Sequence, residues 1–149
     1  GSNTLSGSVA SLTKLKSLYV GGSNTISGSV AALTNLTYLY VGGSNTISGD
    51  IGINNMVNGI TEIILTGNNQ MDTYTAGAVW SNATVTINPA AGYGYDSTEI
   101  DNILIDMANS AGGPSSKTIT LQGSSQARTS ASDAAVATLQ ARGCTIITN

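Results

Sequence analysis

Apolar residues return along the first part of the chain at a fixed interval of 21 positions. Residues 1–21 align with residues 22–42 without a gap, and the octet GGSNTISG at 21–28 recurs letter for letter at 42–49. A period of about 20 to 29 residues indicates a repeat in which each coil buries its apolar face against its neighbours. The recurring apolar positions are Leu5/Ile26/Ile47, Val9/Val30/Ile51, Leu12/Leu33, Leu15/Leu36, Leu18/Leu39 and Val20/Val41.

Short segments in which apolar and polar residues alternate predict the strands of a parallel sheet. In NATVTINPAAG, for example, Val85 and Ile87 point inward between outward polar residues, which is the period of a strand. The less regular coil at 50–59 is expected to add Ile51, Ile53, Met56 and Val57 to the core. The six predicted strands are residues 17–20, 38–41, 62–65, 84–87, 118–121 and 144–148.

The second half of the chain adds two predicted helices. DSTEIDNILIDMANSAGG spaces its apolar residues as one face of a helix does, with Asp96 or Ser97 as the N-cap. SASDAAVATLQARG predicts a second helix that is capped by Ser130 or Ser132 and stopped by Gly143. Each predicted helix follows a predicted strand, so strand and helix alternate in this part of the chain.

The segment LTNLTYLYVGGSNTISGDI at residues 33–51 resembles a leucine-rich repeat of the form L-x-x-L-x-x-L-x-L followed by N-x-L-x-G-x-I. One residue more than the common form allows stands between Val41 and Asn45, which predicts a turn widened by the glycine pair. The resemblance is specific over residues 1–71 and degenerate afterwards. The residues on the pattern are Leu33, Leu36, Leu39, Val41, Asn45, Ile47, Gly49 and Ile51.

The resemblance implies an α/β fold, a leucine-rich repeat solenoid that forms one domain over residues 1–149. Its curved parallel sheet would have about six strands. Irregular segments would form the outer side of the regular repeats in residues 1–71. Helices would cover the degenerate repeats in residues 72–149, and the last unit would act as a C-terminal cap.

The recurring octet is predicted to be a corner of the coil. Gly42 and Gly43 tolerate positive φ, which permits a sharp turn after the strand. The asparagine that follows can bond backbone groups that the turn leaves unpaired. Stacked coils would line these side chains up as a structural ladder, whose members are Asn3, Asn24, Asn45 and Asn69.

The low charge of the chain narrows the classes of partner that we expect. Charged residues make up 9% of the sequence, with a net charge of -3 and only five Lys and Arg. These form no basic stripe, so nucleic acid is not an expected partner. No apolar run approaches the roughly 18 residues of a membrane span, so membrane insertion is not expected either. The abundance of uncharged polar residues favours an extracellular, cell-surface or virion location, and the repeats suggest a bacterial or phage adhesin.

Candidate chemistry for an enzyme is sparse. Histidine is absent, which removes the commonest general base and the commonest metal ligand. The lone Cys144 excludes an internal disulfide and is expected to be buried and inert. Glu62 and Asp72 would form a glycosidase pair only if they converged, and GNNQMD could offer oxygen ligands to calcium, although a polar turn explains that stretch more simply. We expect no catalytic residue, no metal and no cofactor.

The outward side chains of the first three strands are the candidate ligand-binding set. Tyrosine supplies a large contact area and a hydroxyl at small entropic cost, and the next two strands offer mainly Thr. The alternative interpretation is that tyrosines suit strands and merely stack on one another. The expected function is non-enzymatic binding of a protein or glycan through the concave face of the sheet. The set comprises Tyr19, Tyr38, Tyr40, Glu62 and Ile64.

A structural or assembly module is the competing hypothesis. The strand that should precede the first coil is missing, so Leu5 and Val9 are expected near an open end. An unpaired strand edge is a template for further pairing. Either more repeats precede this segment in nature, or the edge meets another molecule in a larger fibre or oligomer.

Overall fold

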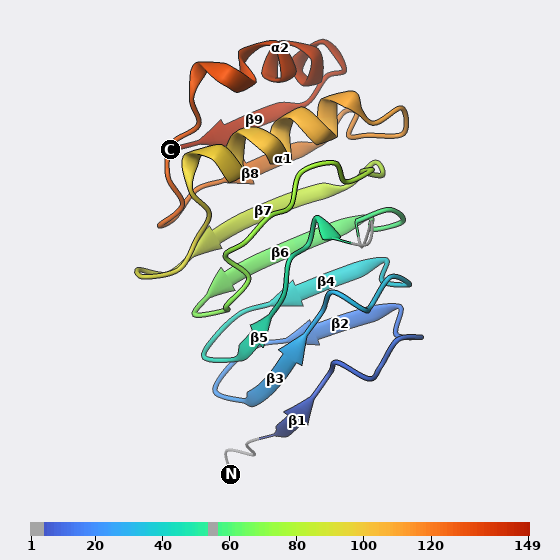
Figure 1. The fold of residues 1–149 in the computed structure, drawn as a ribbon, viewed down its shortest axis with the longest axis vertical. Coiled ribbons are helices and arrows are strands. Elements are labelled where there is room, and N and C mark those ends of the chain that lie inside the picture. The colour runs from blue at the N-terminus through green and yellow to red at the C-terminus, as the bar shows by residue number, and fades with distance from the viewer. Residues whose placement is uncertain (1–4, 54–56) are drawn as a thin grey trace.

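The computed structural model describes residues 5–53 and 57–149, and it shows an α/β solenoid of parallel strands with two helices (Figure 1). One parallel sheet runs the length of the molecule in the order β2-β4-β6-β7-β8-β9. These are the six strands that the alternation of apolar and polar residues predicts. Their bounds are β2 Ser17–Val20, β4 Tyr38–Val41, β6 Glu62–Gly67, β7 Thr84–Pro89, β8 Thr118–Leu121 and β9 Thr145–Thr148.

The register of this sheet places equivalent apolar residues side by side. Leu18 pairs with Leu39, and Leu39 pairs with Ile63. The same row continues through the later strands, and buried side chains from all the coils form one hydrophobic cluster. Burial of an aliphatic side chain stabilises the fold by about 1.5 to 3 kcal/mol, which is less than one coil needs to order its backbone. The coils are therefore stable only when they are stacked.

A second, three-stranded parallel sheet lies on the other side of the first coils, in the order β1-β3-β5 (Figure 1). Its strands are β1 Ser6–Ser8, β3 Thr25–Ser29 and β5 Thr46–Ser48. The prediction that these outer segments are irregular is wrong. Only the Gly-Gly-Ser-Asn part of each octet turns, and Thr-Ile-Ser continues as a strand, because the neighbouring coils supply partners at the same height.

The irregular coil after β5 fills the core less completely than predicted. Ile51 and Val57 are fully buried, as the apolar pattern indicates, but Ile53 is 40% exposed. Met56 lies outside the described residues. The prediction that Ile53 is a core residue is therefore wrong. In the described part of the chain the three-stranded sheet ends at β5. Beyond it there is one isolated bridge, between Ser48 and Gln70.

Helix α1, Ser97–Asn109, replaces the second sheet over the later coils (Figure 1). Asp96 is its N-cap, and the Asp96 side chain and the Glu99 side chain each accept a hydrogen bond from the other residue's backbone N–H. This is a complete capping box. At the other end, the Arg142 guanidinium donates to the carbonyl of Ala108 at 2.7 Å, which places a positive charge at the helix C-terminus.

Helix α2, Asp133–Ala141, follows a short 3-10 helix, η2, Ser130–Ser132. Ser132, one of the two predicted serines, is the N-cap residue of this helix, but its side chain makes no cap hydrogen bond. Thr129 caps the preceding η2 turn instead by accepting from the Ala131 N–H. The helix ends before Gly143, which takes a φ of 80°.

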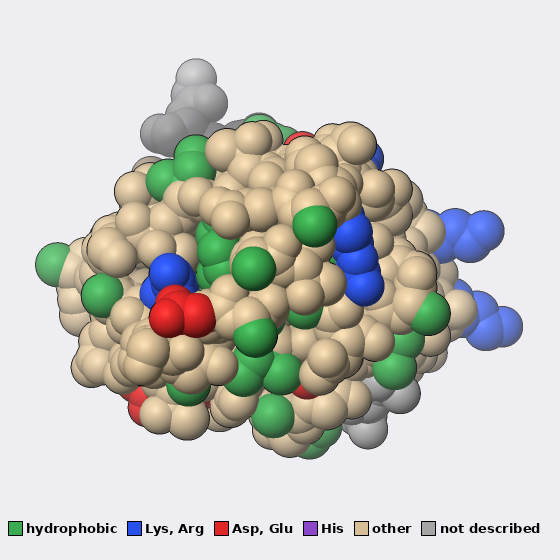
Figure 2. Space-filling view, turned by 90° about the horizontal axis from the view of Figure 1, so that it is seen from above, with side chains coloured by type: hydrophobic (Ala, Val, Ile, Leu, Met, Phe, Trp, Pro, Cys, Tyr) green, Lys and Arg blue, Asp and Glu red, His purple; other side chains and the backbone are tan. Residues whose placement is uncertain are grey.

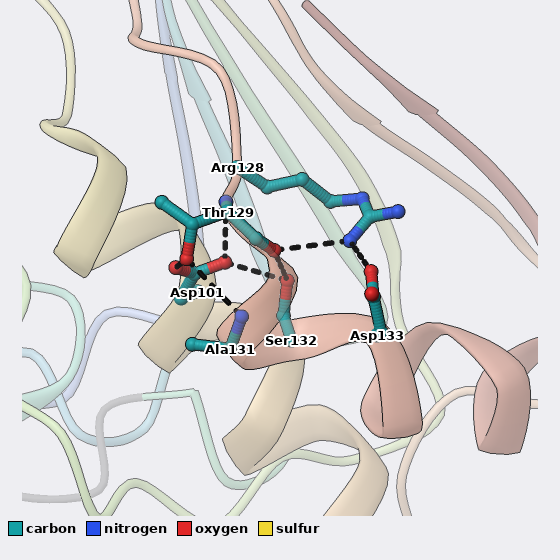
Figure 3. Close-up of polar contacts among 6 residues, drawn as sticks. All are labelled: Asp101, Arg128, Thr129, Ala131, Ser132 and Asp133. Carbon is teal, nitrogen blue, oxygen red and sulfur yellow. Dashed lines mark hydrogen bonds and ion pairs between the residues drawn. The ribbon is translucent and has the colours of Figure 1, made fainter.

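A buried carboxylate joins the two helical units (Figure 3). Asp101 of α1 is 4% exposed and accepts hydrogen bonds from the Thr129 N–H at 3.0 Å and from the Ser132 hydroxyl at 2.6 Å. Beside it, Arg128 and the exposed Asp133 form an ion pair at 2.5 Å. The hydroxyl of Ser132 is thus engaged in holding α1 to the next coil, which explains why it makes no cap hydrogen bond in its own helix.

A second buried carboxylate anchors the loop between β6 and β7. Asp106 of α1 accepts from the Tyr74 hydroxyl at 2.8 Å, from the Gly77 N–H at 2.7 Å and from the Ala78 N–H at 3.0 Å. Trp80, which is 1% exposed, donates its indole N–H to the Tyr74 oxygen at 2.9 Å. This network fixes a long segment that has no strand or helix of its own.

Candidate functional site

The candidate site is the surface of the six-stranded sheet that faces away from the core at β2, β4 and β6. We call the side chains of Tyr19, Tyr38, Tyr40, Glu62 and Ile64 the tyrosine face. The register places Tyr19 beside Tyr40 and Tyr40 beside Ile64 in one row. Tyr38 pairs with Glu62 in the neighbouring row. All five alternate with buried residues along their strands, so rigid sheet backbone holds them on one surface.

Tyr19 and Tyr40 form a stacked pair. Their ring centroids are 4.2 Å apart and their planes differ by 8°. Tyr40 is half-buried, whereas Tyr19, on the edge strand, is 68% exposed. The Tyr19 ring thus packs against the Tyr40 ring and presents aromatic surface to solvent.

Glycines make room for the Tyr40 ring at the ends of two strands. A Cβ at Gly21 would lie 3.2 Å from Cε1 of Tyr40, and a Cβ at Gly42 would lie 3.1 Å from its hydroxyl oxygen. Because these contacts are tighter than ordinary packing, any larger residue at either position would push the ring away. The glycine pair therefore shapes the site as well as the turn.

Glu62 supplies the negative charge of the tyrosine face. Its half-buried side chain lies next to Tyr38, and burial first and the charge of Glu62 second raise the pKa of Tyr38 above its ordinary value. The Tyr38 hydroxyl can donate a hydrogen bond to a ligand. Within the described ranges the ion pair of Arg128 with Asp133 is the only one, so the Glu62 carboxylate has no cation beside it.

Beyond Ile64 the same surface is lined mainly by threonine. The row continues through Thr86 and Thr120 and ends at Ile147 on β9, which is 38% exposed. Threonine offers hydroxyls and small methyl groups but little contact area. The aromatic and acidic side chains are thus concentrated on the N-terminal half of the sheet, as the sequence predicts.

The predicted asparagine ladder lies at the corners after the strands. Asn24 donates to the Gly21 carbonyl at 2.7 Å, Asn45 to the Gly42 carbonyl at 2.6 Å and Asn69 to the Thr66 carbonyl at 3.1 Å. Each amide therefore closes its own turn, and in the described part of the chain no bond joins one of these side chains to the next. Asn3 lies outside the described residues.

The acceptor side of these amides differs from coil to coil. The Asn24 oxygen accepts from the Leu5 N–H of the preceding coil at 3.1 Å, and the Asn69 oxygen accepts from the Met71 N–H at 3.2 Å. The Asn45 oxygen is buried and has no hydrogen-bond partner among the described residues. Each of the three amides thus donates to a backbone carbonyl of its own turn.

The acidic residues considered for catalysis lie apart. Glu62 begins β6, whereas Asp72 follows Gln70, whose bridge to Ser48 places it on the side of the three-stranded sheet. The stretch that could have offered calcium ligands uses the Asn69 side chain within its own turn. Among the described residues no three acidic, His or Cys side chains form a group that could hold a metal ion.

The sequence analysis also considered Cys144 and membrane-spanning segments. Cys144, the residue before β9, is free and 6% exposed. Neither described helix has the length and apolar character needed to cross a membrane. The Asp106 network and the Asp101 cluster were missed, because nothing in the spacing of these carboxylates distinguishes them from ordinary helix-surface acids.

The tyrosine face thus combines an exposed stacked ring pair, a tyrosine hydroxyl and an unpaired carboxylate on one rigid surface. Such a surface can bind apolar, hydroxyl-bearing or cationic groups. No family model, curated protein or solved structure matches the chain.

Proposed function

We propose that this chain is a non-enzymatic recognition module that binds a protein or glycan ligand through the tyrosine face. The stacked pair of Tyr19 and Tyr40 carries the proposal. Tyr19 is 68% exposed, so its ring presents apolar area to water. Stacking on Tyr40 holds the ring in one orientation. Binding that covers this ring gains contact area with little further loss of side-chain freedom.

The chemistry around the pair supports a ligand with hydroxyl or cationic groups. The C–H groups of a sugar ring and the charged head of a Lys or Arg side chain both lie favourably over an aromatic face. Glu62 can accept hydrogen bonds from either kind of group, and Tyr38 can donate one. A glycan or a basic loop of a protein would satisfy all of these contacts together.

We assign the solenoid, as part of this proposal, to the leucine-rich repeat class. The spacing of Leu33, Leu36 and Leu39, the turn asparagine and the long parallel sheet support the assignment. In such solenoids the inner, concave sheet face is the usual binding surface, which is where the tyrosine face would lie. The additional β1-β3-β5 sheet is compatible with it, since it lies on the other side of the coils.

We place the module on an extracellular, cell or virion surface, as part of a bacterial or phage adhesin. Its solubility rests on uncharged polar side chains, with 9% charged residues in the sequence. A surface of Ser, Thr and Asn remains hydrated without creating the strong electrostatic field that draws nonspecific ions and polymers. This supports a module that selects its ligand by shape and hydrogen bonding.

The test compares substitutions at two ends of the same surface. Tyr19→Ala and Tyr38→Ala should each weaken binding to a glycan array or a protein array at least about tenfold, the loss expected for a central aromatic contact. Thr86→Ala and Thr120→Ala, on the threonine-rich half, are the matched controls and should leave binding unchanged. Circular dichroism checks that all four variants fold. Binding that survives both tyrosine substitutions would reject the site.

A further inference from the structure

Glu62 is a half-buried acidic residue in the middle of the tyrosine face. On β6 it pairs with Tyr38 of β4 on one side and with Thr84 of β7 on the other. Ile64, two residues further along β6, lies on the same face and pairs with Tyr40. Both β4 and β6 have a neighbouring strand on each side within the described chain. This part of the face is therefore the same whatever precedes β2 in the protein.

Glu62 differs from most other acidic residues because it has no partner. Among residues 5–53 and 57–149 its carboxylate makes neither a hydrogen bond nor an ion pair. Asp72 also lacks a partner there, but it is exposed to water. The remaining acidic side chains each accept a hydrogen bond within the fold, and they are Asp50, Asp96, Glu99, Asp101, Asp106 and Asp133. Of the described acidic residues, Glu62 is thus the one that is partly withdrawn from water without compensation.

Charge is sparse elsewhere on the surface. Seen from the C-terminal end, the molecule is mainly uncharged and polar, and its most prominent acidic side chain lies against a basic one (Figure 2). Arg128 and Asp133 form the one ion pair that the described residues contain. The Glu62 carboxylate, by contrast, makes no polar contact that stabilises the described fold.

The environment of Glu62 selects the charge of a group that covers it. A neutral group that displaces water from the carboxylate replaces strong hydrogen bonds with others of similar or lower strength, so little is gained. A cationic group supplies a charge-assisted hydrogen bond and a Coulomb attraction, which is stronger at a half-buried site than in open water. The neighbouring Tyr38 adds an aromatic ring, and cations lie favourably over such rings. The site therefore complements a positive charge.

We infer, on the basis of the proposed function, that the ligand of the tyrosine face is a protein segment that presents one arginine to Glu62. A guanidinium donates two parallel hydrogen bonds to a carboxylate and stacks on aromatic rings. Glu62 and Tyr38 offer both partners on adjacent strands, about 4.8 Å apart. The aliphatic part of the arginine would pack on Ile64, which lies on the same face.

Two flanking lysines favour a single positive charge on the ligand at this place. Lys16 precedes β2 and Lys117 precedes β8, and each of these strands lies two positions from β6 in the sheet. That separation is roughly 10 Å, close to the Debye length at physiological salt, so one arginine at Glu62 meets little repulsion. A run of basic residues across the sheet would approach the lysines on either side. The face therefore fits an isolated arginine better than a polybasic tail.

A glycan satisfies the same groups less completely. A neutral sugar brings no charge to the Glu62 carboxylate. An amino sugar carries its ammonium directly on the ring, and it lacks the flexible aliphatic stem that would cover Ile64 while the charge reaches Glu62.

A peptide array probed with the intact chain tests this ligand class. Each Arg-containing peptide on the array has a partner in which citrulline, similar in shape but uncharged, replaces the arginine. Binding should concentrate on Arg-containing peptides and fall at least about tenfold with citrulline. A parallel array carries neutral and amino-sugar glycans. Binding to glycans alone, binding to no Arg-containing peptide, or equal binding to both members of the peptide pairs would overturn the arginine contact.

Three variants assign the effect to Glu62. Glu62→Gln keeps the shape of the side chain and removes its charge, so it should weaken binding to Arg-containing peptides at least about tenfold. Glu62→Asp keeps the charge and should lose less. Asp72→Asn changes the net charge by the same amount at an exposed residue, and as the matched control it should leave binding unchanged. Circular dichroism checks that all three variants fold. Equal losses for Glu62→Gln and Asp72→Asn would overturn a specific role of Glu62.

Salt and the Tyr38→Ala variant separate failure of the arginine contact from failure of the whole face. Raising the salt from about 50 mM to about 300 mM should weaken binding by the parent chain several-fold and leave the residual binding of Glu62→Gln nearly unchanged. Loss of binding with Tyr38→Ala but not with Glu62→Gln would overturn the arginine contact and leave recognition by the tyrosine face standing. Binding that survives both substitutions would overturn both.

Discussion

Tyr19 and Tyr40 stack with their ring centroids 4.2 Å apart, although they belong to different coils. The stack follows directly from the 21-residue period, because parallel pairing in register sets equivalent residues side by side. The same pair serves the fold and the proposed site. Its contribution to stability can therefore be separated from its contribution to binding.

A double-mutant cycle on this pair measures the stabilising part. Tyr19→Ala and Tyr40→Ala should each lower the free energy of unfolding, with a coupling energy of about 0.5 to 1.5 kcal/mol between them, as stacked aromatic pairs show. Urea unfolding of the two single variants and the double variant gives the value. Strictly additive losses would mean that the rings only lie near each other and do not stabilise the sheet.

Gly22 and Gly43 offer a matched pair of turn substitutions. Both take a φ near 70°, so alanine is strained at either position by about 1 kcal/mol. At Gly43 an added Cβ would also lie 2.1 Å from the Gly22 carbonyl oxygen, whereas at Gly22 it would meet none of the described residues within 4 Å. We expect Gly43→Ala to destabilise the chain by about 2 kcal/mol or more beyond Gly22→Ala, as overpacking against backbone does.

Thermal and urea unfolding of both glycine variants decide the point. Equal losses for the two would show that the turn, and not the close approach of successive coils, requires glycine. The comparison isolates coil-to-coil contact because the two residues occupy the same place in the repeat. Among the described residues, only Gly43 of the two has backbone of the preceding coil against it.

The first three strands of the long sheet could be predicted because two independent signals agree on them, and the last three because their apolar and polar residues alternate. Residues such as Leu18 and Val20 alternate with polar neighbours, and the period then repeats the alternation in the next coil. The β1-β3-β5 sheet could not be predicted in the same way. Thr-Ile-Ser is too short to show an alternation of apolar and polar residues, and it is flanked by glycine. Its pairing depends on neighbouring coils at the same height, which is information that no single segment contains.

The composition of the tyrosine face was predictable for the same reason as the strands, but its geometry was not. Alternation places Tyr38 and Tyr40 outward, and the period aligns Tyr40 with Tyr19. The parallel stacking of the rings depends on side-chain rotamers and on the space left by Gly42, which the sequence pattern does not encode. The Asp106 network joins residues about thirty positions apart in the degenerate part, where no period points to partners.

That network supplies a strong stability prediction. Asp106→Ala would leave the Tyr74 hydroxyl and the Gly77 and Ala78 N–H groups without their shared acceptor, and we expect a loss of about 3 to 5 kcal/mol in unfolding free energy. Tyr74→Phe removes one donor and also the acceptor of the Trp80 indole, so it should cost about 1 to 3 kcal/mol.

Chemical denaturation followed by Trp80 fluorescence reports both changes, because Trp80 is the only tryptophan of the chain. Burial first raises the pKa of Tyr74, so its hydroxyl keeps its proton and its donor role through the neutral range. A loss for Asp106→Ala no larger than that for Tyr74→Phe would contradict the idea that one carboxylate organises the whole loop.

Asp101 predicts how stability depends on pH. Its burial pushes the pKa of the carboxyl up, but the hydrogen bonds from Ser132 and Thr129 and the charge of Arg128 outweigh burial and leave the pKa below its ordinary value. Folding therefore favours the carboxylate. This stabilisation is fully present above the carboxyl's pKa in the unfolded chain and is lost as pH falls through the pKa in the folded chain.

The variant Asp101→Asn tests this dependence, because it removes the titrating group and keeps the shape of the side chain. We expect it to lower the unfolding free energy near neutral pH by about 1 to 3 kcal/mol and to flatten the fall in stability on acidification. Asp133→Asn, which breaks the exposed ion pair with Arg128, is the control and should cost about 1 kcal/mol or less. Urea unfolding of all three proteins from neutral to acid pH gives the curves. If Asp101→Asn loses stability with acid as steeply as the parent chain, the buried carboxylate is not the group that governs the acid transition, and the hydrogen bonds to Thr129 and Ser132 stabilise only the local turn.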